Sequence, residues 1–389
     1  MASGRGTSPV TISVAEQSTA PVSLGDPRSG ASAVADSNTP MVELLDRAVA
    51  LEASDVHLSP GCPPAFRRNG LLRSEGSEPL GAEQVRRLIQ SICPEVVWSR
   101  LCKDRDVDFA VAREVGGVCY RFRVNAHFAQ EAMGCSVRVI RGVVPTLEWT
   151  GFPQEVARRI VDLRNGLVLF TGVTGSGKST SMAALIELIN ARGGSRILTL
   201  EQPVEYVFEP HADTVISQRE VGVDVSSLAA GLKYGLRQDP DVILVGEIRD
   251  RETAQLAVTA AETGHLVFST LHTRDAKGAI TRLTDMFTES SKGELRSQLA
   301  LSLRCIVSQH LLPAAADGDR RVLAIEVLFN NLPVSSAVRF GKVEAIPDAI
   351  MAGRNDGMIC LDDWLIELVR SGCVSRETAA RFANNPKRL

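Results

Sequence analysis

The sequence has little that would suit it to nucleic acid or to a membrane interior. Aromatic residues make up only 5% of its 389 residues, and 43 basic side chains are balanced by 46 acidic ones, for a formal net charge of −3. Nucleic-acid-binding proteins usually carry a basic surface, so DNA or RNA is not expected as the main partner. No run approaches the roughly 18 uninterrupted apolar residues of a membrane span, and the N-terminus lacks the pattern of a signal peptide. We expect a cytoplasmic protein that can dock on a membrane complex without crossing the bilayer.

The sequence also lacks paired cysteines. Its eight cysteines are scattered, and no two of them stand at a C-x-x-C spacing. This excludes the zinc-ribbon signature and a thioredoxin-like redox pair. Scattered cysteines in a chain of this length are typical of small packed side chains in a reducing compartment.

Composition and periodicity divide the chain into four parts. Residues 1–40 are rich in Ser, Ala, Gly, Thr and Pro and have no periodic apolar pattern, which predicts a disordered leader. Residues 41–142 predict a small α+β domain, and residues 143–150 a linker. Residues 151–389 alternate short apolar runs with helical patterns, which predicts an α/β domain with a mainly parallel sheet and helices on both faces, ending in a helical tail at 332–389.

Particular elements can be placed within these domains. In the first domain we expect helices at 41–53 and 82–92 and strands at 56–58, 65–68, 107–111 and 118–124. In the second we expect strands at 167–171, 197–200, 242–245 and 266–269 and helices at 178–191, 226–236, 250–262 and 275–285. The strand at 118–124 alternates apolar with polar residues, which places Arg121 and Arg123 side by side on its polar face.

A phosphate-binding loop is the strongest local signal. The sequence Gly172-Val-Thr-Gly-Ser-Gly-Lys-Ser179 satisfies G-x-x-x-x-G-K-[ST], and it stands between an apolar strand and a helix, the context that the motif requires. Its glycines allow backbone N–H groups to surround phosphates at a helix N-terminus. Lys178 would neutralise phosphate charge, and the Ser179 hydroxyl would bind Mg²⁺. The expected nucleotide-binding residues are Gly172, Thr174, Gly175, Ser176, Gly177, Lys178, Ser179 and Thr180. No N-K-x-D sequence is present to read guanine, so ATP is the expected nucleotide.

Two glutamates follow apolar strands downstream of this loop. Glu247 comes directly after Val242-Ile-Leu-Val-Gly246, the layout of a Walker B segment, and Glu201 ends the run Ile197-Leu-Thr-Leu. The carboxyl ends of parallel strands carry the functional groups of α/β sheets. Hydrolysis needs a carboxylate that orients water, so both are candidates for catalysis, although a single glutamate at a strand end is more often simply solvated.

Four segments, taken together, resemble the ATPases of the secretion superfamily, which serve type II and type IV secretion and type IV pili. They are the loop at 172–179, the stretch Leu198-Thr-Leu-Glu-Gln-Pro-Val-Glu205, the stretch from Asp239 to Asp250, and the stretch Thr263-Gly-His-Leu-Val-Phe-Ser-Thr-Leu-His-Thr273. In that family they are called Walker A, Asp box, Walker B and His box. The resemblance covers residues 41–389 and is greatest to the pilus-retraction branch.

The resemblance implies a hexamer whose subunits have a PAS-like N-terminal domain and a RecA-like C-terminal domain, acting on an inner-membrane platform protein at the cytoplasmic face. It implies that Glu247 is the catalytic carboxylate, with a possible Mg²⁺ contact through water, and that Glu201 assists it. His272 would sense the γ-phosphate, and His265 would support the His box.

The resemblance also gives a role to arginines of the first domain. Arg121 and Arg123, in the string Arg-Phe-Arg-Val-Asn125, would reach the phosphates when the domains close, and Arg138 is a weaker candidate for the same role. Two solvated arginines on a polar strand face are the alternative.

The sequence departs from the family pattern in the Asp box and near the C-terminus. Gln202 stands where the family usually has Asp, and the region 336–342 shares only Ala337 and Arg339 with the stretch that the family ties to retraction. The four-cysteine zinc insert of other branches is missing. Retraction, extension and secretion therefore stay open. A low-turnover regulatory or docking subunit is a second hypothesis, and a RecA-type nucleic-acid translocase a third.

Overall fold

The computed structural model describes residues 40–389, apart from residues 69, 212 and 317–319. The expected disordered leader at 1–40 lies outside the described residues, except for Pro40. No helix of the described residues is long and apolar enough to cross a membrane.

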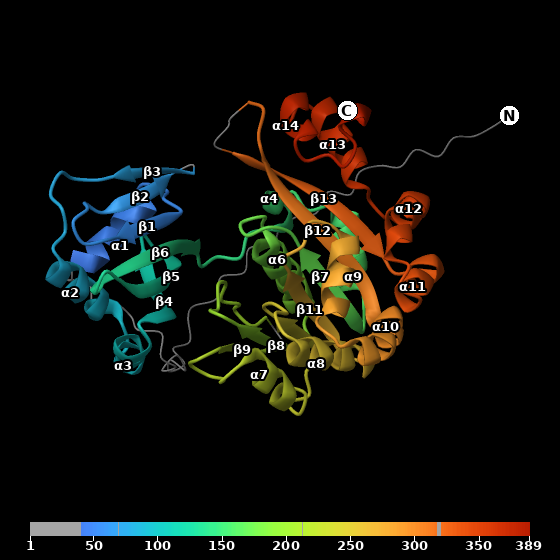
Figure 1. Cartoon of the computed structure of the whole chain (residues 1–389), viewed down its shortest axis with the longest axis horizontal. Coiled ribbons are helices and arrows are strands. Elements are labelled where there is room, and N and C mark those ends of the chain that lie inside the picture. Colours follow the sequence, from blue (N-terminus) through green and yellow to red (C-terminus); the bar gives the residue numbers. More distant parts are fainter. Residues whose placement is uncertain (1–39, 69, 212, 317–319) are drawn as a thin grey trace, which may run out of the picture. The chain divides into compact units, whose positions relative to one another are not determined.

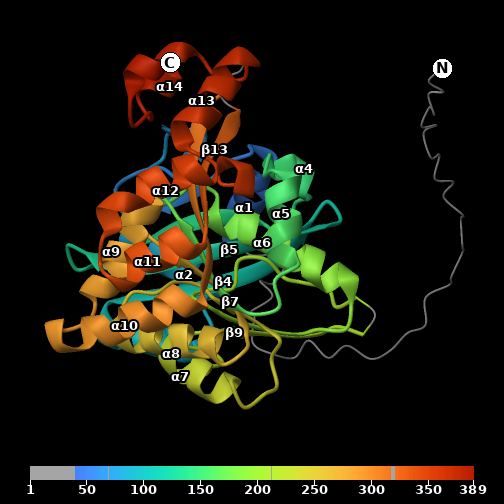
Figure 2. The ribbon, with the colours of Figure 1, turned by 90° about the vertical axis from the view of Figure 1, so that its right-hand side faces the viewer.

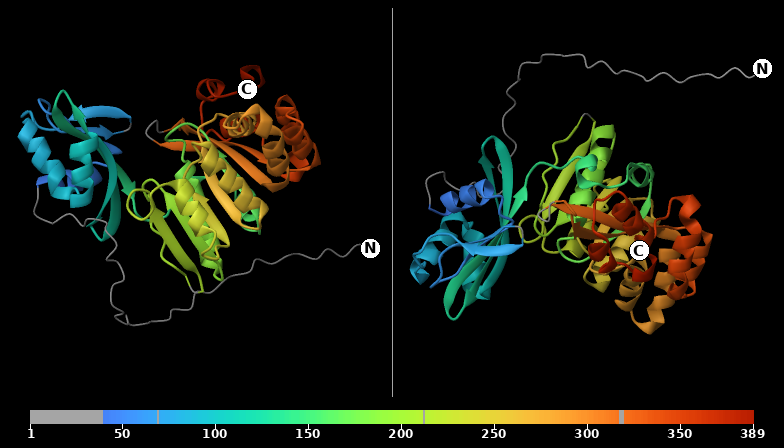
Figure 3. Two further views of the ribbon diagram at one scale, coloured as in Figure 1. Left: turned by 60° about the horizontal axis from the view of Figure 1, so that its bottom comes forward. Right: turned by 90° about the horizontal axis from the view of Figure 1, so that it is seen from above.

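The first sheet is antiparallel throughout, with six strands in the order β3-β2-β1-β6-β5-β4. Its strands are β1 (Asp55–Leu58), β2 (Ala65–Arg68), β3 (Leu71–Ser74), β4 (Asp106–Val115), β5 (Val118–Ala129) and β6 (Ala132–Arg141). The helices of this part are α1 (Pro40–Ala50), α2 (Ala82–Ile92) and α3 (Glu95–Asp104). Figure 3 shows α1 and α2, in blue and light blue, against one face of the sheet.

Alternation along the strands separates the two faces of this sheet. Phe122 and Val124 on β5 are fully buried and pack with Leu45 of α1 and Ile89 of α2 in one apolar core. Arg121 and Arg123, which alternate with these two residues along β5, point to the opposite face because successive side chains of a strand alternate. Polar residues of β1, β4 and β6 share that face, which we call the polar face of the first sheet.

The second sheet has seven strands in the order β13-β12-β7-β11-β10-β8-β9, and only the β12–β13 pair is antiparallel (Figure 1). Its strands are β7 (Gly166–Thr171), β8 (Arg196–Glu201), β9 (Val215–Glu220), β10 (Val242–Val245), β11 (Leu266–Leu271), β12 (Leu303–Pro313) and β13 (Arg321–Phe329). Every residue of β7, β10 and β11 is buried. This is the expected character of central parallel strands covered on both faces.

Helices cover both faces of the second sheet. Figure 2 shows α4 (Leu147–Thr150), α5 (Gln154–Val161) and α6 (Lys178–Arg192) on one side, and α8 (Arg251–Glu262), α9 (Ala276–Asp285) and α10 (Glu289–Ser302) on the other. α7 (Leu228–Gly235) packs beside α8 and β8. The C-terminal part consists of α11 (Leu332–Arg339), α12 (Ile346–Ala352), α13 (Leu361–Arg370), α14 (Arg376–Ala380) and three short 3-10 turns.

The strands and helices expected in both domains are present, with ends shifted by a few residues. Nine helices and strands of the described residues had not been predicted: β3, α3, β6, α4, α5, β9, α10, β12 and β13. The longest strand among them, β12, pairs with β7 on one side and β13 on the other. β13 is the one antiparallel strand of the sheet, and Glu326 interrupts its otherwise apolar, buried run.

Candidate functional site

The phosphate-binding loop connects the end of β7 to the start of α6. Gly175 and Gly177 have φ of +78° and +89°, a region that glycine adopts without steric cost. At Gly172 a Cβ atom would lie 2.5 Å from the backbone oxygen of Gln309 on β12. The glycines thus allow the tight turn at one end and the close approach to β12 at the other, and they leave the helix N-terminus open to an anion.

Lys178 is a nearly buried cation that is held by carbonyls. Its Nζ donates to the backbone oxygens of Gly172 at 2.9 Å and Val173 at 3.0 Å. Within the described part of the chain, no carboxylate lies within ion-pair distance of this Nζ. Burial lowers the pKa of Lys178, and the negative charges of Glu247 and Glu205 act in the opposite direction. A desolvated ammonium group at a helix N-terminus favours a phosphate as its counter-ion.

Glu247 and His272 meet at the ends of neighbouring strands. The Glu247 carboxylate lies 3.3 Å from His272 Nε2 and also contacts the Arg249 guanidinium. Glu247 follows Gly246, whose N–H donates to the Leu200 carbonyl at 2.8 Å. A Cβ atom at Gly246 would lie 3.3 Å from that same oxygen. The glycine therefore allows the Walker B segment to run close beside the end of β8.

Glu201 occupies the end of β8 with its carboxylate enclosed by hydrogen-bond donors. The Thr199 hydroxyl donates to its Oε1 at 2.7 Å, and the Gln218 amide donates to the same atom at 3.4 Å. Burial raises the pKa of Glu201 to about 7, helped by the charge of Glu205 and opposed by these hydrogen bonds. Glu201 can therefore change its charge near neutral pH, a property that is common at functional sites.

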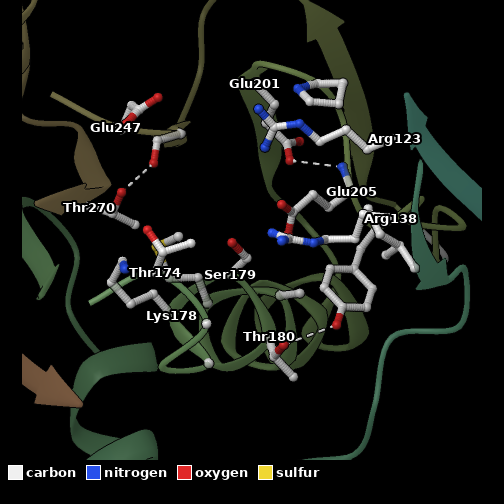
Figure 4. A pocket seen from close by; sticks show the side chains of 18 of the residues that line it. Arg123, Arg138, Thr174, Lys178, Ser179, Thr180, Glu201, Glu205, Glu247 and Thr270 are labelled. Atoms are coloured by element: carbon white, nitrogen blue, oxygen red, sulfur yellow. Dashed lines mark hydrogen bonds between the residues drawn. The ribbon is translucent and has the colours of Figure 1, made fainter. Parts of the chain in front are cut away.

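These groups line one cavity of about 1210 Å³ at the carboxyl edge of the second sheet. Figure 4 shows Lys178, Ser179 and Thr180 below, with Glu201, Glu205 and Glu247 above. The cavity lining contains most of the expected nucleotide-binding and catalytic residues: Thr174, Gly175, Gly177, Lys178, Ser179, Thr180, Glu201, Glu247 and His272. Gly172 and Ser176 are buried and are not part of the lining.

The donor set around this cavity suits Mg²⁺. Ser179 contributes a hydroxyl oxygen, and Glu201, Glu205 and Glu247 contribute carboxylates to the same lining. Oxygen ligands of this kind, completed by water and phosphate oxygens, are what Mg²⁺ prefers. Gln202 lines the cavity too, but it offers a neutral amide.

The arginines of the first sheet divide into two groups. Arg123 and Arg138 line the cavity and are directly paired across β5 and β6. Arg121 is not in the lining; its guanidinium lies 3.4 Å from the Glu220 carboxylate on β9, with both side chains nearly buried. The expectation that Arg121 and Arg123 share one strand face holds, but only Arg123 faces the phosphate loop, because Glu220 engages Arg121.

His265 does not line the cavity. It stands immediately before β11, where its carbonyl accepts from Gly166 N–H and its Nδ1 lies 3.0 Å from the Ala260 carbonyl. His272 follows the other end of β11. A six-residue strand separates its two ends by roughly 20 Å. His265 therefore contacts the backbone at the start of the strand, and its expected support of the His box stays a prediction.

Some cavity residues were not singled out by sequence reasoning. Tyr206, Thr270 and Phe208 line the cavity. The Tyr206 hydroxyl lies 3.0 Å from the Thr180 hydroxyl, and the Thr270 hydroxyl donates to the Gly246 carbonyl at 2.7 Å. Thr270 could have been found as part of the His-box segment. Nothing in the local pattern marks Tyr206, since its partner comes from another element.

Comparison with known proteins agrees with this geometry. The family model described as type II/IV secretion system protein matches residues 36–336. The chain belongs to this family. The members that it resembles include the type IV pilus retraction ATPase PilT of Pseudomonas aeruginosa, which is 42% identical over 347 residues, covering 89% of this chain and 99% of the relative. They also include a twitching motility protein of Neisseria gonorrhoeae, 39% identical over 84% of this chain and 86% of the relative.

A solved structure that this chain resembles has the same fold. The crystal structure of the pilus retraction motor PilT with bound ADP superimposes with a TM-score of 0.78 at 37% identity, covering 89% of this chain and 98% of that chain. Because the alignment spans nearly all of both chains, the family resemblance extends over both sheets of the present structure and is not confined to the phosphate loop.

Proposed function

We propose that this chain is the ATP-hydrolysing subunit of a hexameric motor that powers a type IV pilus, in the manner of PilT, or a related type II or type IV secretion machine. The first sheet with α1–α3 then corresponds to a PAS-like N-terminal domain, and the second sheet with its helices to a RecA-like ATPase domain. The similarity to PilT along nearly its whole length supports this proposal.

The single observation that carries the proposal is the convergence on one cavity of a phosphate loop, two strand-end glutamates and a histidine. The loop amides and Lys178 bind the phosphates of ATP, and Ser179 holds Mg²⁺. Bound Mg²⁺ would neutralise phosphate charge. Glu247, oriented by His272 at 3.3 Å, positions and polarises the attacking water.

Hydrolysis is coupled to movement through the first domain in this proposal. Arg123 and Arg138 face the cavity from the polar face of the first sheet. ATP would draw these arginines onto its phosphates, and release of phosphate would free them, so that each subunit closes and opens during turnover. A ring of six subunits would pass this motion to an inner-membrane platform protein at the cytoplasmic face.

The test is Mg²⁺-dependent phosphate release from ATP by the purified chain beside Glu247→Gln. The amide retains the shape of the side chain but cannot take a proton, so we expect turnover to fall at least about 100-fold while ATP binding persists. The matched control is Glu262→Gln, an exposed glutamate near the end of α8, which should leave the rate unchanged. A Glu247→Gln variant that hydrolyses ATP at the wild-type rate would exclude the proposed role.

A second candidate function, a regulatory subunit with little turnover, is favoured by Gln202. This residue lines the cavity with a neutral amide where the family usually has a carboxylate. A folded wild type that binds ATP without hydrolysing it would support the regulator, and Gln202→Asp should then raise turnover.

A further inference from the structure

The loop that follows Glu201 is fastened to the helix that follows the phosphate loop. It runs from the end of β8 to the start of β9 and carries Tyr206. The Tyr206 hydroxyl lies 3.0 Å from the Thr180 hydroxyl, the bond drawn as a dashed line at Thr180 in Figure 4. Thr180 stands next to Ser179, near the N-terminus of α6. This bond thus spans two segments that carry separate parts of the site.

The same part of the loop is also linked to Glu201 through one side chain of β9, that of Gln218. The Gln218 amide nitrogen donates to Glu201 Oε1 at 3.4 Å and to the Tyr206 carbonyl at 2.7 Å. The Gln218 carbonyl oxygen accepts from the Phe208 N–H at 2.9 Å. Hydrogen bonds therefore link the Glu201 carboxylate to the Gln218 amide, and this amide to the Tyr206 carbonyl. The hydroxyl of the same Tyr206 residue is bonded to Thr180, which completes the connection.

The Tyr206 hydroxyl can take part in these hydrogen bonds at any pH near neutrality. Its ring packs against the apolar core of the second sheet, and burial raises the pKa of its hydroxyl. The phenol accordingly stays protonated and can both donate and accept. The ring alone would satisfy the packing, so the hydroxyl has a separable contribution.

We propose that Tyr206 is a positioning residue, whose hydroxyl couples the Glu201 loop to the phosphate-binding helix through Thr180. The proposal deepens the function proposed above and rests on it. A positioned Glu201 loop keeps its carboxylates in register with the phosphates, and misplacement of such groups by a fraction of a bond length is enough to slow a reaction. The role is indirect, because Tyr206 acts through Thr180 and Glu201.

The test is Tyr206→Phe, which keeps the ring and removes the hydroxyl. Loss of one such hydrogen bond should lower kcat for ATP about fivefold and weaken MgATP binding about twofold, with an unchanged melting temperature. Tyr234→Phe is the matched control, because the Tyr234 side chain on α7 is 61% exposed; its kcat should equal that of wild type. If the hydroxyl had a purely structural role, its loss would instead lower the melting temperature. The kcat measured at temperatures well below the melting temperature would then be unchanged.

A double-mutant cycle with Thr180→Val decides whether the bond itself matters. If Tyr206 acts through Thr180, the double variant should be no slower than the slower single variant. Additive losses, or a wild-type kcat in Tyr206→Phe, would overturn the proposal. A folded wild type without turnover would contradict the motor function alone. In that case the same four proteins are compared by their Kd for MgATP. Non-additive changes in Kd would still support the coupling, and additive changes would still overturn it.

Discussion

The carboxyl edge of the second sheet and the polar face of the first sheet both line the cavity, but their side chains are held by different kinds of contact. At the sheet edge, Lys178 and Glu201 are enclosed by backbone carbonyls and by uncharged hydrogen-bond donors. On the polar face, Arg138 pairs with Asp55 at 3.0 Å and Arg123 with Asp108 at 3.8 Å. The Arg138 side chain is 49% exposed and that of Arg123 is 32% exposed.

The difference indicates which part of the site is preorganised and which part is free to rearrange. The free-energy cost of removing enclosed groups from water is met during folding, so these groups bind the nucleotide without rearrangement. Exposed ion pairs contribute little stability, typically below about 1 kcal/mol, and can exchange one anion for another. The arginines can therefore leave their carboxylates for phosphate oxygens at small cost. Arg121 is the exception on its face, since its pair with Glu220 is nearly buried.

The largest effect that would sharpen this comparison comes from replacing Arg123 and Arg121 separately. Arg123→Ala should reduce kcat about 100-fold through lost charge stabilisation, with a change in unfolding free energy below about 1 kcal/mol. Arg121→Ala should destabilise the fold by about 3 kcal/mol, because it leaves the nearly buried Glu220 carboxylate without its charged partner and with only the Val204 N–H as a donor to the same oxygen. Phosphate release measures the turnover of both variants, and thermal unfolding measures their stability.

The reverse result would break the comparison. If Arg121→Ala stayed as stable as wild type but lost turnover, the pair with Glu220 would be as exchangeable as the others. Arg121→Ala combined with Glu220→Gln is the control, since removing both charges should restore much of the lost stability.

The contrast also explains how much of the site could be predicted from the sequence. Residues 172–180 form a contiguous motif, and Glu201 and Glu247 end apolar runs, so local pattern was sufficient to find them. The different partners of Arg121 and Arg123 were not predictable, because Glu220, which binds Arg121, lies 99 positions further along the chain.

Tyr206 was missed for the same reason, since its partner Thr180 belongs to another element. His265 shares a motif with His272, but β11 separates the two, and only His272 of this pair lines the cavity. Local pattern placed the strands β7, β8, β10 and β11 of the second sheet, four strands of the first sheet and most of the long helices. The edge strand β9 escaped it, because none of its residues is fully buried and its pattern is polar, whereas β13 was missed although most of its residues are buried.

A smaller effect is expected at Glu201, and it depends on pH. Its pKa of about 7 in the folded protein stands above the ordinary value of 4.5, so the folded state retains a proton that the unfolded state has lost between these values. The stability from this group is present below 4.5 and is lost as the pH rises through 7. Glu201→Gln should therefore be about 2 kcal/mol more stable than wild type at pH 8, with partial exposure limiting the gain, and about equal to it at pH 4.5.

Turnover should respond to the same substitution in the opposite sense. We expect Glu201→Gln to lower kcat about tenfold at pH 8, because the uncharged amide cannot assist Glu247. The wild-type rate should decline below pH 7 as Glu201 takes up a proton, and the variant should lack that part of the profile. Denaturant unfolding and phosphate release across this pH range measure both. A variant that is less stable than wild type at pH 8 would show that the Glu201 carboxylate is not strained by burial.

The smallest effect tests whether the exposed pairs of the polar face restrain their arginines. Asp108→Asn removes the partner of Arg123 at 3.8 Å, so ATP no longer competes with a carboxylate for that guanidinium. We expect the Kd for MgATP to fall about twofold, with a change in unfolding free energy below about 0.5 kcal/mol. Glu75→Gln is the matched control, because it breaks the exposed Arg47–Glu75 pair of the same domain at residues that do not line the cavity. Equal shifts in both variants would mean that net charge alone changes the affinity, whereas a shift in Asp108→Asn alone would identify Asp108 as the group from which Arg123 must be released.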